Sequence, residues 1–310
     1  MKTDGGEVAS VIDIGSNTIK FLVAAKGLKV LDHGSEDVRI GTGMGRGGPI
    51  VLQEQAMNAA AQCVRRLWEG AEAFSPKHRC IVATSAVRDA RNRDDFAGMV
   101  REATGEEIRI LTGVEEAQYV GDGVAHDPNI AARKPFYLMD LGGGSLEILE
   151  YGGGMVRQKV SLPLGAVRLK EKLIADPAAP MNKGDIAEVA EYIAESLFAS
   201  GFDFRSPAAM VGTGGGLTHA RFLIGADKGL SQQDSSPMLS LGDMRALMLK
   251  VSGMSIAERR NLPHLPAARA DIMPVAMIVL TTVMELATAG SIVHSFYNLR
   301  YGIAAELLGD

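Results

Sequence analysis

Two glycine-rich turns in this chain carry residue types that bind phosphate and metal ions. An apolar, strand-like segment leads into Asp13 and a turn at residues 15–17, and the same order returns at Asp140 and a turn at residues 142–145. Turns built from small residues expose backbone N–H groups that form concave anion sites. A carboxylate at a strand end can hold a hard cation, directly or through water. The two copies predict duplicated domains that face each other across a phosphate-binding cleft.

A third glycine-rich turn and one arginine add to the candidate phosphate ligands. The turn at residues 212–216 follows a short apolar segment and contains the hydroxyl of Thr213. Arg88 follows another strand-like segment, and a guanidinium can grip phosphate through two parallel hydrogen bonds. Position alone explains Arg88 equally well as a surface arginine paired with Asp89.

Three glutamates are candidates for handling water or a cation. Glu115 and Glu116 lie near a predicted helix start, where carboxylates are often only favourable partners of the helix dipole. Consecutive helical residues point about 100° apart, so at most one of these two faces a cleft squarely. Glu147 lies two residues beyond Ser145 on a strand, and the two side chains should share a face. Glu147 therefore either reaches the phosphate site or is a solvated strand residue.

Composition excludes several classes of protein. The 310 residues suffice for two domains, since single cores usually stop growing near ~250–300 residues. A hydrophobic content of 46% and a charged content of 22% are typical of a globular protein. The net charge of −5 gives no basic surface for indiscriminate nucleic-acid binding, so no specific nucleic-acid partner is expected.

The sequence predicts a cytoplasmic protein with no membrane segment. Cys63 and Cys80 are the only cysteines, so a disulfide framework is excluded and a reducing compartment is favoured. Residues 1–7 have no apolar core of a signal peptide. The longest apolar stretch, residues 275–289, is too short to span a bilayer and contains Glu285. The six histidines are scattered and lack the pairing of a zinc or HD-type site.

The order of predicted elements is that of an α/β protein with two domains, 1–125 and 126–298. A final helix at 299–310 is expected to pack on the first domain. In that domain we expect helices at 53–74, 94–104 and from 113, strands at 79–84 and 108–111, and a loop at 36–49. In the second domain we expect a strand at 136–140, turns at 142–145 and 152–154, helices at 166–174, 183–199, 243–251, 255–260 and 271–289, and a strand at 291–296.

Several blocks, taken together and in order, resemble the exopolyphosphatase and guanosine pentaphosphate phosphatase (Ppx/GppA) family of the actin-like ATPase superfamily. The resemblance implies two actin-like (ribonuclease H-like) domains, in the short form that lacks extra C-terminal domains. It covers nearly the whole chain. The blocks lie at residues 13–17, 83–90, 113–117, 140–147, 164–169, 212–215, 269–272 and 299–302.

The resemblance also implies roles for individual residues. Glu116 is the expected general base that activates or orients the attacking water, and Glu115 is expected to be structural. Asp140 and Glu147 are expected to position magnesium, or another divalent cation, or the nucleophilic water. Asp13 is a further candidate for holding the ion. The expected phosphate-binding residues are Gly15, Ser16, Asn17, Arg88, Gly142, Gly143, Gly144, Ser145, Gly212, Thr213, Gly214 and Gly215.

Some positions depart from the family pattern or stay ambiguous. Gly216 and Leu217 stand where many relatives continue with Thr and a longer residue, and Tyr301 stands where some relatives carry Glu. Arg168 either extends the basic lining of the site or pairs with Glu171, and Arg300 is similarly ambiguous.

The expected activity is hydrolysis of the terminal phosphoanhydride of inorganic polyphosphate, releasing orthophosphate. Hydrolysis of guanosine pentaphosphate is the alternative within the family. An ATPase or kinase of the actin-like superfamily and a non-catalytic sensor of polyphosphate or alarmone are further alternatives. The retained carboxylates at 116, 140 and 147 speak against a sensor. A homodimer is compatible with the resemblance.

Overall fold

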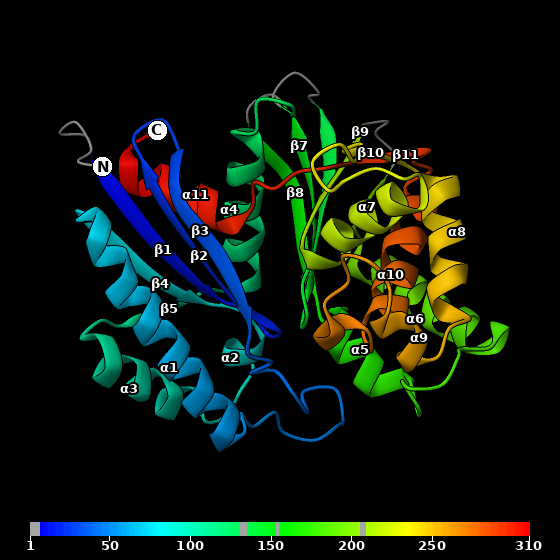
Figure 1. Ribbon diagram of the computed structural model, residues 1–310, viewed down its shortest axis with the longest axis horizontal. Coiled ribbons are helices and arrows are strands. Elements are labelled where there is room, and N and C mark those ends of the chain that lie inside the picture. Colours follow the sequence, from blue (N-terminus) through cyan, green and yellow to red (C-terminus); the bar gives the residue numbers. More distant parts are fainter. Residues whose placement is uncertain (1–6, 131–134, 153–154, 205–208) are drawn as a thin grey trace. The chain divides into compact units, whose positions relative to one another are not determined.

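The computed structural model describes residues 7–130, 135–152, 155–204 and 209–310 (Figure 1). The chain divides into two compact units: unit 1 comprises Met1–His126 and Tyr297–Asp310, and unit 2 comprises Asp127–Phe296. Each unit contains one β-sheet with helices packed on it. The predicted α/β class is confirmed.

Unit 1 is built on a five-stranded sheet in the order β3-β2-β1-β4-β5. The first three strands pair antiparallel, whereas β4 runs parallel to β1 and β5 runs parallel to β4. The strands are β1 Val8–Ile14, β2 Thr18–Ala25, β3 Lys29–Asp37, β4 His78–Ala83 and β5 Ile108–Ile110. The helices are α1 Glu54–Ala71, η1 Glu72–Phe74, α2 Ser85–Arg88, α3 Arg93–Thr104, α4 Gly113–Ala125 and α11 Leu299–Leu308.

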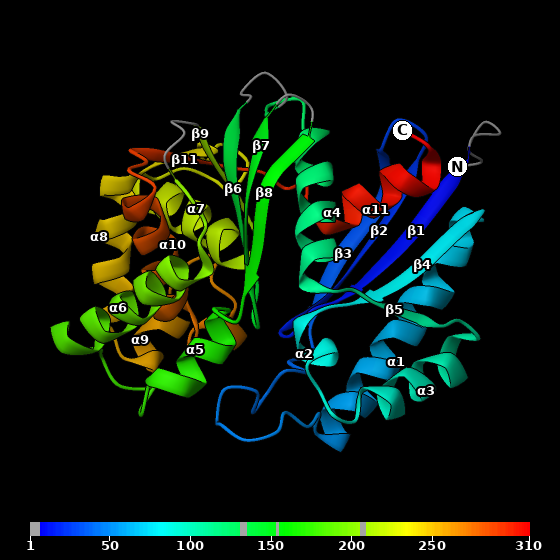
Figure 2. The same ribbon diagram turned by 180° about the vertical axis from the view of Figure 1, so that it is seen from behind.

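Helices cover both faces of the sheet in unit 1. Helices α1 and α3 lie on one face, and α4 and α11 lie on the other (Figures 1 and 2). The buried side chains of α1 include Met57, Ala60, Val64 and Trp68, a spacing that forms one apolar stripe on a helix. All seven residues of β1 are buried, as expected of a strand covered on both faces.

Two glycines let α4 and α11 touch backbone to backbone. A Cβ atom on Gly123 would overlap the carbonyl of Asn298, and one on Gly302 would overlap the carbonyl of Tyr119. The Tyr119 hydroxyl also donates to the Glu306 carboxylate. The helix that begins with the candidate catalytic segment is thereby fixed against α11.

Unit 2 has a six-stranded sheet in the order β10-β11-β9-β6-β7-β8. Strands β6, β7 and β8 pair antiparallel, β9 runs parallel to β6, and β11 runs parallel to β9. The strands are β6 Phe136–Leu141, β7 Leu146–Gly152, β8 Met155–Leu162, β9 Ala209–Thr213, β10 Met238–Ser240 and β11 Ser291–His294. The helices are α5 Ala166–Leu173, α6 Lys183–Ser200, α7 Gly215–Asp227, α8 Leu241–Ser252, α9 Ile256–Arg260, η2 Ala267–Arg269 and α10 Met273–Leu286.

Helix α10 is the centre of the core of unit 2. It contacts α5, α6, α7 and α8, and Figure 2 shows these helices gathered on one side of the sheet. Residues Met273–Met284 along it are all buried, in one cluster with sheet residues such as Met139 and Ile148. A helix that is apolar all round belongs in the interior, which explains the long apolar stretch of the sequence.

Both units begin with the predicted hairpin. In unit 1 the hairpin β1–β2 places Asp13 opposite Lys20, and in unit 2 the hairpin β6–β7 places Asp140 opposite Glu147. A third antiparallel strand follows in each unit, and further strands add in parallel on the other side of the hairpin. The duplication inferred from the glycine turns is therefore present in the fold.

Some elements differ from the prediction. Strand β3 includes residues 36 and 37, which were expected to begin a loop, and most of its residues are polar and exposed. The third turn leads into helix α7, which was not predicted because its first residues are glycines. The predicted turn at 152–154 lies mostly outside the described residues, since only Gly152 is described.

Candidate functional site

The first turn (residues 15–17) is closed by hydrogen bonds from a neighbouring loop. The N–H of Gly15 donates to the Thr18 carbonyl at 3.1 Å. The carbonyls of Ser16 and Asn17 accept from the N–H groups of Gly41 and Arg39, each at 2.8 Å. Because these carbonyls are turned toward the loop, the turn keeps a defined peptide orientation, as an anion site made of backbone donors requires.

The Asn17 side chain has its donors engaged inside unit 1. Its Nδ2 donates to the Thr18 hydroxyl at 3.2 Å and to the Asp37 carboxylate at 3.0 Å. Its Oδ1 is buried and accepts no hydrogen bond from the part of the chain that the structure describes. A carboxylate partner fixes this orientation of the amide, because only the NH₂ group can donate to it. The side chain thus presents an acceptor, which suits a metal-bound water better than a phosphate oxygen.

Asp13 is a buried carboxylic acid on the strand before that turn. Its exposed fraction is 8%, and burial raises the pKa of the carboxyl, while the positive charges of Lys20 and Arg300 oppose the rise. Arg300 itself donates to the Phe21 carbonyl at 2.6 Å, so it ties α11 to β2. The ambiguity about Arg300 is resolved toward a role within unit 1.

Arg88 and Glu116 form the most direct contact between predicted site residues. The Arg88 Nη1 donates to Glu116 Oε2 at 2.8 Å and to the Leu111 carbonyl at 3.1 Å. Its Nε also lies 3.5 Å from the Asp89 carboxylate. Glu116 is only 7% exposed, so the ion pair holds this carboxylate in one position at the start of α4.

Glu115 has the structural role expected for it. Thr112 and Glu115 form a capping box at the start of α4, with both the N–H and the hydroxyl of Thr112 donating to Glu115 at 2.8 Å. These hydrogen bonds, with that of Arg109, hold the pKa of the Glu115 carboxyl below its usual value. The cap therefore engages the Glu115 carboxylate, whereas the Glu116 carboxylate pairs with Arg88.

The second turn (residues 142–145) is fastened to the first turn of α5. The Gly142 carbonyl accepts from the Ala166 N–H at 3.0 Å, and the Gly143 carbonyl accepts from the Val167 N–H at 2.9 Å. The Arg168 Nε donates to the Gly144 carbonyl at 2.9 Å. Arg168 therefore braces the turn, a role that sequence analysis did not consider for it.

Asp140 and Glu147 lie on one face at the end of the hairpin. They are directly paired across β6 and β7, and in an antiparallel pair such side chains are close neighbours. Glu147 is 2% exposed and accepts from the Ser161 hydroxyl at 2.7 Å, so it is not a solvated strand residue. The structure thus brings two of the three expected cation ligands together, whereas Asp13 belongs to unit 1.

The third turn (residues 212–216) lies beside the second. Thr213 is 1% exposed and pairs with Asp140 across β9 and β6. A Cβ on Gly214 would come within 2.7 Å of the Asp140 Oδ1 atom. Helix α7 begins at Gly215, and a helix N-terminus presents N–H groups and a partial positive charge to anions.

One residue beside the third turn was quoted for the resemblance but given no role. A Cβ on Gly215 would overlap the guanidinium of Arg269, so that side chain packs directly on the turn. Its signal in the sequence was only the family block 269–272, because the chain places it far from residue 215. The contact places a cation beside the third turn.

The carboxylates of unit 2 suit a magnesium ion that also binds the substrate. Among the described residues, no group of three or more acidic, histidine or cysteine side chains could hold a metal alone. Magnesium is commonly held by one or two carboxylates, with phosphates and waters completing its shell. The pair Asp140 and Glu147 fits this pattern.

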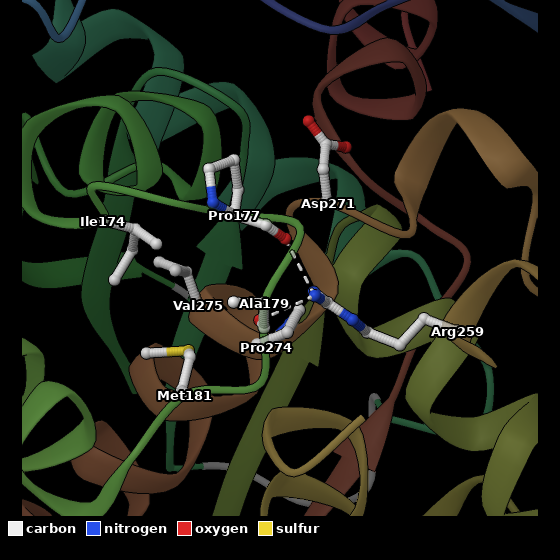
Figure 3. A pocket seen from close by; sticks show the side chains of 8 residues that line it. All are labelled: Ile174, Pro177, Ala179, Met181, Arg259, Asp271, Pro274 and Val275. Carbon is white, nitrogen blue, oxygen red and sulfur yellow. Dashed lines mark hydrogen bonds between the residues drawn. The ribbon is translucent and has the colours of Figure 1, made fainter. Parts of the chain in front are cut away.

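A pocket in unit 2 shows how the segment carrying Arg269 is fixed. Arg259 is 1% exposed and donates to the Ala270 carbonyl at 2.9 Å. It also donates to the carbonyls of Pro177 at 2.8 Å and Ala179 at 3.4 Å (Figure 3). Asp271 beside it pairs with Lys170 at 3.1 Å. Since the guanidinium binds backbone carbonyls of two separate segments, we interpret its role as structural: it holds these segments together. The residues that line the pocket are Ile174, Pro177, Ala179, Met181, Arg259, Asp271, Pro274 and Val275.

Solved structures of other proteins have the same fold as this chain. A structure of an exopolyphosphatase from Cytophaga hutchinsonii superposes with a TM-score of 0.86 at 23% identity, over 98% of each chain. A member of the Ppx/GppA family from Aquifex aeolicus has a TM-score of 0.80 at 22% identity, over 98% of each chain. At these identities the likeness shows the fold. Both structures share the fold of this chain over nearly its whole length.

No helix in the described ranges is both long and apolar enough to cross a membrane. A sequence model of the Ppx/GppA phosphatase family matches residues 21–310, which is nearly the whole chain. The chain therefore belongs to the Ppx/GppA phosphatase family.

Proposed function

We propose that this phosphatase is an exopolyphosphatase, which hydrolyses the terminal phosphoanhydride bond of inorganic polyphosphate and requires magnesium. The observation that carries the proposal is the buried Glu116 carboxylate held by Arg88 at 2.8 Å, at the start of α4. An acid in this setting can orient a water, while the arginine beside it can bind the phosphate that the water attacks.

The terminal phosphates of polyphosphate would be bound by many hydrogen-bond donors. Backbone N–H groups of the three turns and the guanidinium of Arg88 contact the terminal phosphates, and Arg269 adds charge beside the third turn. Asp140 and Glu147 would hold the magnesium ion, which neutralises charge on the phosphates when it is bound. The negative chain would thus be bound by backbone dipoles and by cations.

The chemical step requires little more than positioning. Glu116 orients the water and takes its proton as the new P–O bond forms at the terminal phosphorus. The bond to the bridging oxygen breaks, and the shortened chain leaves with that oxygen. Because phosphoryl transfer has a loose transition state, alignment of the water and charge stabilisation contribute more than basicity.

The test is orthophosphate release from long-chain polyphosphate, guanosine pentaphosphate and ATP, each with magnesium. Glu116→Gln should lower kcat on the true substrate by about 10²–10⁴-fold, the usual size of a general-base contribution. Glu115→Gln is the matched control, since this neighbouring carboxylate caps the helix, and it should keep a near-normal kcat. Equal losses in both variants would contradict the role of Glu116.

The substrate comparison decides between the alternatives. Guanosine pentaphosphate is the second candidate because the family that matches the chain includes both activities in its name. Faster turnover of guanosine pentaphosphate would replace the first proposal with this one. Turnover of ATP alone would favour an actin-like ATPase, and binding of polyphosphate without turnover would favour a sensor.

A further inference from the structure

A buried histidine lies next to the third turn and has no part in the proposed chemistry. His294 is the last residue of β11, pairs in register with Gly212 of β9, and is 3% exposed. A polar ring in such a place must find hydrogen-bond partners, because burying an unpaired polar group is costly. Its partners lead to the phosphate-binding backbone.

His294 accepts a hydrogen bond at one ring nitrogen and donates one from the other. Its Nε2 lies 3.0 Å from the Thr218 hydroxyl, and its Nδ1 lies 3.4 Å from Nη1 of Arg221. Arginine can only donate, so Nδ1 accepts and the proton of the neutral ring is on Nε2. The ring then donates to Thr218, whose own proton goes to the Gly214 carbonyl at 3.0 Å.

Both ends of this chain of hydrogen bonds are anchored. At one end, Arg221 donates through Nε to the Ser235 hydroxyl at 2.9 Å and through Nη2 to the Ser235 carbonyl at 2.7 Å. The ring of Phe296 packs edge-on against His294 with centroids 4.6 Å apart. At the other end, the Gly214 carbonyl also accepts from the Thr218 N–H at 3.1 Å.

The Gly214 carbonyl determines where the next N–H group points. Gly214 has φ 98° and ψ 159°, a conformation that essentially only glycine adopts. The peptide that joins Gly214 to Gly215 is planar and trans, so its C=O and N–H point in opposite directions. Holding the carbonyl toward Thr218 therefore turns the Gly215 N–H away from Thr218, as a donor at the start of α7.

We propose that His294 is a positioning residue for phosphate binding: through Thr218 it fixes the Gly214 carbonyl and so aims the Gly215 N–H at a substrate phosphate. This inference rests on the proposed function, in which the third turn binds phosphate. It adds a residue that does not itself touch the substrate.

The test combines kinetics with a double-mutant cycle. His294→Leu and Thr218→Val each break the same chain of hydrogen bonds and should raise KM for polyphosphate about three- to tenfold, the effect of one hydrogen bond. Turnover at saturation should stay within about twofold. The double variant should be no worse than either single variant, because the chain is already broken. Thr218→Ser keeps the hydroxyl and should keep the normal KM.

The binding of inorganic tripolyphosphate, measured by calorimetry, gives a second readout that needs no turnover. It should weaken by the same factor in both single variants. If His294→Leu does not fold, the variants of the partly exposed Thr218 still test the proposal. Thr218→Val should then have a higher KM and weaker tripolyphosphate binding than Thr218→Ser.

The outcomes separate the two proposals. Folded variants with normal KM and normal tripolyphosphate binding, in an active protein, would overturn the role of His294 alone. Fully additive losses in the double variant would also overturn it. A wild-type protein that neither hydrolyses polyphosphate nor binds tripolyphosphate would overturn the proposed function and this inference with it.

Discussion

The hairpins that begin the two units share one backbone design and differ in the residue that faces the strand-end acid. Asp13 lies opposite Lys20 in unit 1, whereas Asp140 lies opposite Glu147 in unit 2. The turn carbonyls also have different partners, a loop after β3 in unit 1 and the start of helix α5 in unit 2. The glycine turn is thus common to both copies, and the charge beside it is not.

This difference assigns different tasks to similar hairpins. A lysine across from an acid supplies a positive charge from the chain itself, and such opposite-charge pairs favour the ionised acid. Two acids directly across from each other repel unless a cation is bound between or beside them. We therefore expect the metal requirement to depend mainly on the carboxylates of unit 2, and water activation to depend on Glu116 in unit 1.

Among changes to the two hairpins, the largest effect is expected from changing the acid pair in unit 2. Glu147→Gln keeps an acceptor for Ser161 but removes one charge from the pair. The magnesium concentration for half-maximal activity should rise about 10–100-fold, the usual loss when a group that holds or tunes a metal is removed. A titration of activity with magnesium measures the shift.

Glu150 provides the control on the same strand. It is 6% exposed, and it accepts from the Gln158 side chain at 2.9 Å, so Glu150→Gln also removes a buried charge from β7. This variant should leave the magnesium requirement unchanged. A similar shift in both variants would show that loss of buried charge in β7, rather than metal binding, explains the first result.

The buried histidine of unit 2 predicts a weakening of the fold in acid. Burial, aided by the charges of Arg221 and His219, lowers the pKa of His294 to about 3. The pKa of histidine in the unfolded chain is about 6.5. Below this pH the unfolded chain binds a proton that the folded chain does not bind, so the free energy of unfolding falls as the pH falls. Between pH 7 and pH 5 this group should cost about 2 kcal/mol of unfolding free energy.

Denaturant unfolding at several pH values measures this slope. His294→Leu should remove that part of the slope, whatever its effect on stability at neutral pH. His126→Gln, which changes an exposed ring, should leave the slope as it is. An unchanged slope in His294→Leu would contradict the prediction.

The parts of the fold that were predictable have strong local patterns. Runs of strand-forming residues and glycine turns predicted the two hairpins, and apolar stretches predicted helices α10 and α11. Strand β3 escaped prediction because it is a polar strand at the edge of its sheet, where little apolar alternation is required. Helix α7 escaped because glycines, which disfavour helices, occupy its start.

The site was less predictable, since its contacts join distant segments. Arg88 and Glu116 are 28 positions apart, and only the tertiary fold brings the end of α2 and the start of α4 close enough for their hydrogen bond at 2.8 Å. Tertiary packing likewise produces the hydrogen bond from Arg259 to the Ala270 carbonyl and the contact of Arg269 with Gly215. Local sequence shows the residue types, whereas their partners come from the fold.

The smallest effect is expected from giving the hairpin of unit 1 the charges of unit 2. Lys20→Glu places a carboxylate opposite Asp13, as Glu147 lies opposite Asp140. Burial already raises the pKa of Asp13, and Lys20 opposes that rise, so the substitution should raise this pKa further. With a raised pKa the acid is tolerated while protonated, and its contribution to stability is lost as the pH rises through the folded value.

The unfolding free energy of Lys20→Glu should therefore be close to that of the wild type near pH 4 and lower by about 1 kcal/mol near pH 8, the size of one cross-strand charge pair. Lys20→Met separates loss of the lysine from gain of the acid, and it should show a smaller loss at pH 8. Magnesium should recover little of the stability lost by Lys20→Glu if the hairpin of unit 1 lacks the other features of a metal site. Full recovery by magnesium would show instead that two facing acids are sufficient, and that the two hairpins differ in this one position alone.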